Sequence, residues 1–121
     1  MKILVVDDSK AMRMIVKRNL SQVDAFAEAE ILEAEDGAAA LEIIRGGGEP
    51  DLVLSDWNMP TMTGLELLQQ LRAEGSTVRF GFVTSESQSS MREQAIASGA
   101  LFFLAKPFSA ADFGDLVGTV L

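Results

Sequence analysis

Residues 2–8 read KILVVDD, an almost wholly apolar run that ends in two adjacent aspartates. A second apolar run, Leu52–Leu54, is followed closely by Asp56, and a third, Leu101–Leu104, leads into Lys106-Pro107. If these runs are neighbouring parallel strands, their carboxyl ends bring three carboxylates and one ammonium group to one edge of a sheet. Open α/β folds build their sites at that edge.

Three carboxylates gathered in this way would repel one another. Two unit charges about 4 Å apart repel by about 4 kcal/mol at an effective dielectric constant near 20. One lysine cannot neutralise three such charges, so the pattern implies a bound divalent cation. The chain has no Cys and no His, which excludes thiolate and imidazole ligands and leaves oxygen to hold the metal.

Short apolar runs alternate with segments of helical periodicity along the whole chain, which predicts a parallel sheet with helices on both faces. The expected strand and helix pairs are 3–6 with 9–20, 27–34 with 36–45, 52–55 with 64–74, 80–84 with 89–98, and 101–104 with 110–121. Residues 27–35 alternate small apolar residues with Glu, which suits a strand at the sheet edge. The length of 121 residues fits one domain, residues 1–121.

Polar residues and glycines mark the ends of the expected helices. Asp36 and Ser109 precede two of the helical segments, where N-cap residues are expected. Gly46, Gly75 and Gly99 follow three others, at positions where helices commonly end in a left-handed conformation. These signals agree with the boundaries that the apolar periodicity predicts.

The composition argues against two kinds of partner. The formal net charge is −8, and without a basic stripe to displace phosphate counterions we expect no direct contact with nucleic acid. No apolar stretch approaches the ~20 residues that a membrane span needs. Met1 leads directly into the first apolar run, with no charged and apolar leader. We therefore expect a soluble cytoplasmic protein, not bound to membranes, that is a monomer at rest.

Five sequence blocks occur in an order that is typical of one protein family. They are Asp7-Asp8-Ser9 with Met12-Arg13, Glu33-Ala34 with Asp36-Gly37, Asp56-Trp57-Asn58-Met59-Pro60 with Gly64, Thr84-Ser85-Glu86, and Lys106-Pro107-Phe108. In these blocks, which span nearly the whole chain, the sequence resembles the receiver domains of two-component response regulators, most of all the single-domain chemotaxis type. The resemblance implies a doubly wound, flavodoxin-like sheet of five parallel strands in the order 2-1-3-4-5, for which a protein of this family is a standard example.

The resemblance also implies a phosphoacceptor site. Asp56 would be the carboxylate nucleophile that takes a phosphoryl group from a phosphohistidine of a histidine kinase or histidine phosphotransfer protein. Lys106 would balance charge on the phosphoryl oxygens, and Thr84 would hydrogen-bond one of them. Such a protein is not an enzyme in the usual sense, because it catalyses only its own phosphorylation and dephosphorylation.

The metal site implied by the resemblance uses the same edge of the sheet. Mg²⁺, with Mn²⁺ as a substitute, would be held by the carboxylates of Asp8 and Asp56 and by the main-chain carbonyl of Asn58. Asp7 would act through a water molecule. Waters and a phosphoryl oxygen would complete the oxygen-rich octahedron that Mg²⁺ prefers.

A switch and an output surface follow from the same resemblance. In the family, Thr84 moves toward the phosphoryl group and an aromatic residue swings inward; Phe103 is the matching residue, and a plain core role for it stays open. Chemotaxis proteins carry Tyr there, so this departure weighs against a flagellar-motor target.

The resemblance also assigns residues to the lifetime of the acyl phosphate and to partner binding. Asn58 and Glu86 flank the acyl phosphate and would tune its lifetime. The fourth helix, fifth strand and fifth helix would bind a downstream protein target through Met91, Arg92, Gln94, Phe103, Ala105 and Leu116.

Three other functions compete with this one. A flavodoxin-like electron carrier shares the topology, but Asp7-Asp8 on the first loop would repel the flavin phosphate. A haloacid-dehalogenase-type phosphatase needs an Asp-x-Asp pattern after the first strand and usually a cap domain, and the sequence has neither. A receiver that serves as a phosphate sink or kinase regulator, without an output target, remains an open alternative.

Overall fold

A computed structural model describes residues 1–47, 49–85, 88–106 and 109–118. One parallel sheet runs through it, with the strand order β2-β1-β3-β4-β5. The strands are β1 (Lys2–Val6), β2 (Glu30–Ala34), β3 (Leu52–Ser55), β4 (Arg79–Thr84) and β5 (Phe102–Ala105). This confirms the predicted doubly wound α/β class and its strand order.

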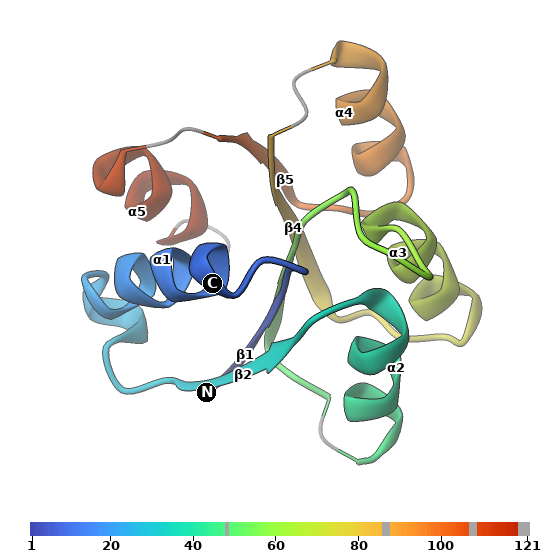
Figure 1. Ribbon diagram of the computed structural model, residues 1–121, viewed down its shortest axis with the longest axis horizontal. Coiled ribbons are helices and arrows are strands. Elements are labelled where there is room, and N and C mark those ends of the chain that lie inside the picture. The colour runs from blue at the N-terminus through green and yellow to red at the C-terminus, as the bar shows by residue number, and fades with distance from the viewer. Residues whose placement is uncertain (48, 86–87, 107–108, 119–121) are drawn as a thin grey trace.

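Helices cover both faces of the sheet (Figure 1). They are α1 (Lys10–Ser21), α2 (Gly37–Arg45), α3 (Gly64–Ala73), α4 (Ser89–Ala97) and α5 (Ala110–Gly118). Figure 1 shows α1 and α5 on one face and α2, α3 and α4 on the other. Each face of the sheet carries its own hydrophobic core, and alternate residues of β1 belong to the two cores. Ile3 and Val5 pack into one, and Leu4 and Val6 pack into the other. Among the described helices, none has the length and apolar content needed to cross a membrane.

The second strand differs from the prediction in where it begins. The sequence pattern predicted a strand from residue 27, but β2 starts at Glu30. Before it, Asp24–Phe26 form a short 3-10 helix, η1, which buries Phe26, and the amide of Ala29 donates to the carbonyl of Phe26 at 3.0 Å. The burial of one aromatic ring therefore outweighs the strand-like alternation of the small residues after it. The predicted edge position of β2 is confirmed.

The predicted helix caps are confirmed with one exception. Asp36 caps α2, because its Oδ1 accepts from the amide of Ala39 at 2.8 Å. Gly75 and Gly99 adopt φ angles of +87° and +106°, as expected for left-handed helix ends. Gly46 was predicted wrongly: its φ is −72°, and the left-handed position is Gly47, with φ +100°.

The N-cap predicted at Ser109 is also confirmed. The Ser109 side chain accepts from the amide of Asp112 at 3.0 Å, and the Ser109 carbonyl accepts from the amide of Phe113. These bonds satisfy amides in the first turn of α5, which otherwise lack partners within the helix. The fifth helix therefore starts where the sequence predicts. Its neighbouring strand β5 starts at Phe102, one residue later than expected.

Gly81 lets the last strand pack closely on the fourth. A Cβ atom built on Gly81 would lie 2.1 Å from Cζ of Phe102, which is its register partner in β5. No other residue fits there unless the phenyl ring moves, because real Cβ contacts are longer than 3 Å. The ring therefore occupies the space that a side chain at position 81 would take.

Candidate functional site

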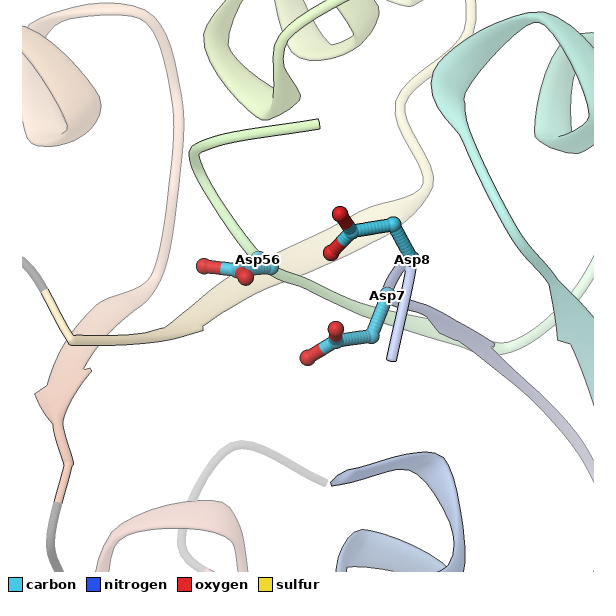
Figure 2. Close-up of side chains that lie close together, drawn as sticks. All are labelled: Asp7, Asp8 and Asp56. Carbon is cyan, nitrogen blue, oxygen red and sulfur yellow. The ribbon is translucent and has the colours of Figure 1, made fainter. Parts of the chain in front are cut away.

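The register of the central strands brings the predicted carboxylates together. Val6 of β1 pairs with Ser55 of β3, so Asp7 and Asp8 follow one strand beside the point where Asp56 follows the other. One carboxylate oxygen from each aspartate can be chosen so that all three lie within 4.8 Å of one another. Figure 2 shows the three side chains grouped beyond the ends of the two strands. Asp7 and Asp56 are buried, whereas Asp8 is exposed.

Lys106 reaches this cluster from the end of β5. Its amide donates to the carbonyl of Thr84 at 2.7 Å, and its Nζ lies 3.1 Å from Oδ2 of Asp7 and 3.6 Å from Oδ2 of Asp56. The ammonium group thus pairs with Asp7 and Asp56, and the cluster of three carboxylates keeps an excess of negative charge. The donor set is made of oxygen atoms, and Asp8 keeps it open to solvent, so these residues fit a hard divalent cation such as Mg²⁺.

The environment of Asp56 disfavours its charge. Burial is the main cause that raises the pKa of Asp56 above its ordinary value, and the negative charge of Asp7 raises it further. Hydrogen bonds from the Thr84 side chain and the Trp57 amide, and the charge of Lys106, act in the opposite direction. The Trp57 amide lies 2.7 Å from Oδ1 of Asp56. The ionised form of Asp56 is therefore destabilised in the fold, and a bound cation would stabilise it.

The loop after Asp56 is held by tight packing. A Cβ on Gly64 would lie 2.1 Å from the carbonyl oxygen of Asp56, so only glycine allows α3 to begin so close to the site. Thr61 adopts a positive φ of 66°, which is uncommon for a β-branched residue, and its Oγ1 donates to Oδ2 of Asp36 at 3.2 Å. Asn58, the predicted main-chain metal ligand, is exposed on this loop.

Trp57, Phe82 and Phe103 form an aromatic cluster that adjoins the site, because Trp57 directly follows Asp56 in the chain. The ring centroid of Trp57 lies 5.1 Å from that of Phe82 and 6.1 Å from that of Phe103. Phe103 is only 3% exposed, and the guanidinium carbon of Arg92 lies 5.5 Å from the centre of its ring. The ring therefore already points inward in the unmodified chain and is covered by a residue of the predicted output surface.

The other predicted residues are spread over α4, β5 and α5. Met91 is half-buried against the core, and Arg92 and Gln94 are exposed on α4. Ala105 is half-buried at the end of β5. Leu116 belongs to α5, and its side chain lies outside the described part of the structure. The predicted residues that lie outside the described ranges altogether are Glu86, Pro107 and Phe108.

Arg13, which had no predicted role, contacts the site, and Glu33 contacts Arg13 in turn. Arg13, in the first turn of α1, donates from Nη1 to the carbonyl oxygen of Asp7, and its Nε lies 3.0 Å from Oε1 of Glu33. Both residues belong to the sequence blocks that carry the family resemblance. The spacing of Arg13 and Glu33 in the sequence does not predict their contact, because Arg13 lies on helix α1 and Glu33 on strand β2.

Comparisons with known proteins agree with this architecture. The sequence profile of the response regulator receiver domain matches residues 3–117. The chain is 35% identical to the chemotaxis protein CheY1 of Helicobacter pylori over 111 residues, which cover 90% of this chain and 87% of that protein. A chemotaxis protein CheY homolog of Campylobacter jejuni is 36% identical and covers 90% of this chain, with 83% of its own length matched.

Solved structures show the same likeness in three dimensions. The chemotaxis protein CheY4 of Vibrio cholerae superimposes with a TM-score of 0.85 at 31% identity, covering 99% of this chain and 98% of that one. The receiver domain of the putative response regulator NarL of Mycobacterium tuberculosis gives a TM-score of 0.85 at 30% identity, covering 98% and 94%. Profile, relatives and structures thus agree that the chain belongs to the receiver-domain family and is a two-component response regulator.

Proposed function

We propose that Asp56 accepts a phosphoryl group from a phosphohistidine on a histidine kinase or histidine phosphotransfer protein. A carboxylate oxygen of Asp56 attacks the phosphorus atom, the new P–O bond forms as the P–N bond breaks, and the neutral imidazole leaves after taking up a proton. The product is an acyl phosphate. The observation that supports this role most directly is that Nζ of Lys106 lies 3.6 Å from Oδ2 of Asp56, beside two further carboxylates.

The neighbouring groups position the reaction and compensate charge. Lys106 offers a positive charge where the phosphoryl oxygens would gather, and the Trp57 amide orients the Asp56 carboxylate through Oδ1. Thr84, at the end of β4, would move its hydroxyl from the carboxylate to a phosphoryl oxygen. Mg²⁺ bound by Asp8, Asp56 and the Asn58 carbonyl, with Asp7 acting through water, would neutralise the remaining negative charge.

The phosphorylated protein would signal through the surface formed by α4, β5 and α5, in a chemotaxis-type pathway in the cytoplasm. The protein itself turns over no external substrate apart from its phosphodonor. Phosphorylation can shift the output surface only by the difference in free energy that it creates between two states, typically a few kcal/mol. Phe103 belongs both to this surface and to the aromatic cluster, and the guanidinium carbon of Arg92 lies 5.5 Å from the centre of its ring.

The proposed function can be tested by following Trp57 fluorescence. Mg²⁺ should give a saturable change, because Trp57 directly follows Asp56 and its amide donates to Oδ1 of Asp56. Acetyl phosphate or beryllofluoride should then give a second change, and mass spectrometry should detect one added phosphoryl group with acetyl phosphate. Asp56→Asn should abolish the second change, whereas Asp24→Asn, at an exposed aspartate in η1, should leave it intact.

Two results would contradict the proposal. The first is the absence of a Mg²⁺ response in the folded protein, and the second is phosphorylation that persists in Asp56→Asn. A phosphate sink would behave differently from an effector in a later step. It would take phosphoryl groups from the kinase rapidly, yet the phosphorylated and unphosphorylated forms would bind candidate output targets equally.

A further inference from the structure

Every main-chain and side-chain polar group of Asp7 has a hydrogen-bond partner. Its amide donates to the carbonyl of Ala34 at 3.1 Å. Its Oδ1 accepts from the Ser9 amide at 2.9 Å, and its Oδ2 accepts from Nζ of Lys106 at 3.1 Å. The fourth partner is Arg13, whose Nη1 donates to the Asp7 carbonyl oxygen. The first three bonds fix the strand end and the carboxylate, whereas the fourth fixes the peptide that leads to Asp8.

Arg13 uses two sides of its guanidinium group at once. Nη1 binds the Asp7 carbonyl, and Nε pairs with Oε1 of Glu33 in the neighbouring strand β2 at 3.0 Å. The second carboxylate oxygen of Glu33 accepts from Nζ of Lys17, one turn further along α1, at 3.1 Å. The Arg13 side chain is only 14% exposed. A planar fork with several donors can make both contacts, whereas a lysine has one nitrogen to place.

We infer that Arg13 is a positioning residue that orients the Asp7–Asp8 peptide, and through it the two carboxylates, for cation binding. The peptide unit is planar, so a hydrogen bond to the Asp7 carbonyl also sets the direction in which the chain enters Asp8. Asp8 is exposed, which makes this peptide the nearest fixed support for its side chain. The inference rests on the proposed function, since it concerns how the proposed metal site is held.

The test compares Arg13→Lys with Arg18→Lys, the same change at an exposed residue of the same helix. Mg²⁺ affinity is measured from Trp57 fluorescence, and folding from thermal unfolding in EDTA. Residues that orient metal ligands typically change metal affinity by about 10-fold or more when altered, so Arg13→Lys should weaken Mg²⁺ binding by about 10-fold. Arg18→Lys should leave it unchanged. Glu33→Gln should cost at most about 5-fold, because exposed ion pairs contribute little.

A second readout needs no metal. Hydrogen exchange of the Ser9 amide, which donates to Oδ1 of Asp7, should become faster in Arg13→Lys than in the unaltered chain, while Arg18→Lys should match the unaltered chain. The inference is overturned if Arg13→Lys lowers the melting temperature but changes neither Mg²⁺ affinity nor Ser9 exchange, or if Arg18→Lys has the same effects. If the unaltered chain fails to bind Mg²⁺, the proposed function fails, and Ser9 exchange alone then decides whether Arg13 orients the peptide.

Discussion

Replacing Asp56 by Asn should stabilise the metal-free protein, although it removes the proposed reactive group. Burial and the Asp7 charge raise the pKa of Asp56, so its ionised form is disfavoured in the fold. The cost is present in full above the raised pKa and disappears as the pH falls toward the ordinary value of 3.8. Asn keeps nearly the same shape and an oxygen that can accept from the Trp57 amide, but it carries no charge.

The size of the effect follows from the distances around Asp56. Carboxylate oxygens at the upper limit of their separation, 4.8 Å, repel by about 3.5 kcal/mol per pair at an effective dielectric constant near 20. The attraction to Lys106 at 3.6 Å is about 4.6 kcal/mol on the same scale. Because exposed Asp8 is well screened by solvent, the repulsions from Asp7 and Asp8 together roughly cancel this attraction. The penalty for burying the charge therefore decides the balance, and we expect a gain of about 1–2 kcal/mol.

The assay is thermal unfolding in EDTA at neutral pH. For a chain of 121 residues, the expected gain corresponds to a rise in melting temperature of about 4–8 °C. Saturating Mg²⁺ should reverse the order, because a ligand at 100 times its dissociation constant stabilises the unaltered chain by about 2.7 kcal/mol. Asp24→Asn serves as the control at an exposed carboxylate. An Asp56→Asn variant that melts no higher than the unaltered chain in EDTA, or whose advantage persists below pH 3.8, would refute the reasoning.

Three other substitutions test the packing around the site. Gly81→Ala should lower the free energy of unfolding by about 2–3 kcal/mol, because its new methyl group collides with the Phe102 ring. Phe102→Leu in the same chain should recover part of that loss. Urea unfolding that shows no loss of stability in Gly81→Ala would contradict this packing. Thr61→Asn should gain about 1 kcal/mol, since Asn tolerates the positive φ of 66° better than a β-branched residue, and a loss in urea unfolding would show that the contact with Asp36 matters more. Phe103→Ala should cost about 3–5 kcal/mol and change Trp57 emission, because their rings lie 6.1 Å apart; unchanged emission would argue against a shared cluster.

Much of the fold could be predicted because each apolar run ends at a clear polar signal. Parallel strands place their carboxyl ends at one edge, so the grouping of Asp7, Asp8 and Asp56 could be predicted once the family resemblance supplied the strand order. The start of β2 could not be predicted in this way. Its alternating small residues have little apolar area, and the decisive contact is the burial of Phe26 in a different element.

Other details of the site depend on contacts between elements and leave no mark in the local sequence. The sequence could not predict that Gly47, and not Gly46, adopts the left-handed conformation, because both are glycines and either can adopt it. In the sequence, Arg13 has the features of an ordinary helix residue. Its contact with Glu33 arises only because the fold places β2 beside α1. The inward direction of Phe103 depends on the rings of Trp57 and Phe82 and on the cover that Arg92 supplies. The sequence predicts which residues meet more readily than how they are oriented.

The edge strand β2 has a consequence for the behaviour of the protein at high concentration. No described strand pairs with its outer side, so a strand from a second molecule could add there. Glu30 is exposed on this strand and Glu35 is exposed just beyond it, so two copies that approach edge to edge meet like charges. Glu33 adds less to this repulsion, because Arg13 and Lys17 pair with it. Dissolved salt screens repulsion between exposed charges. Aggregation by sheet extension should therefore be suppressed at low ionic strength and become more prominent in concentrated salt solutions.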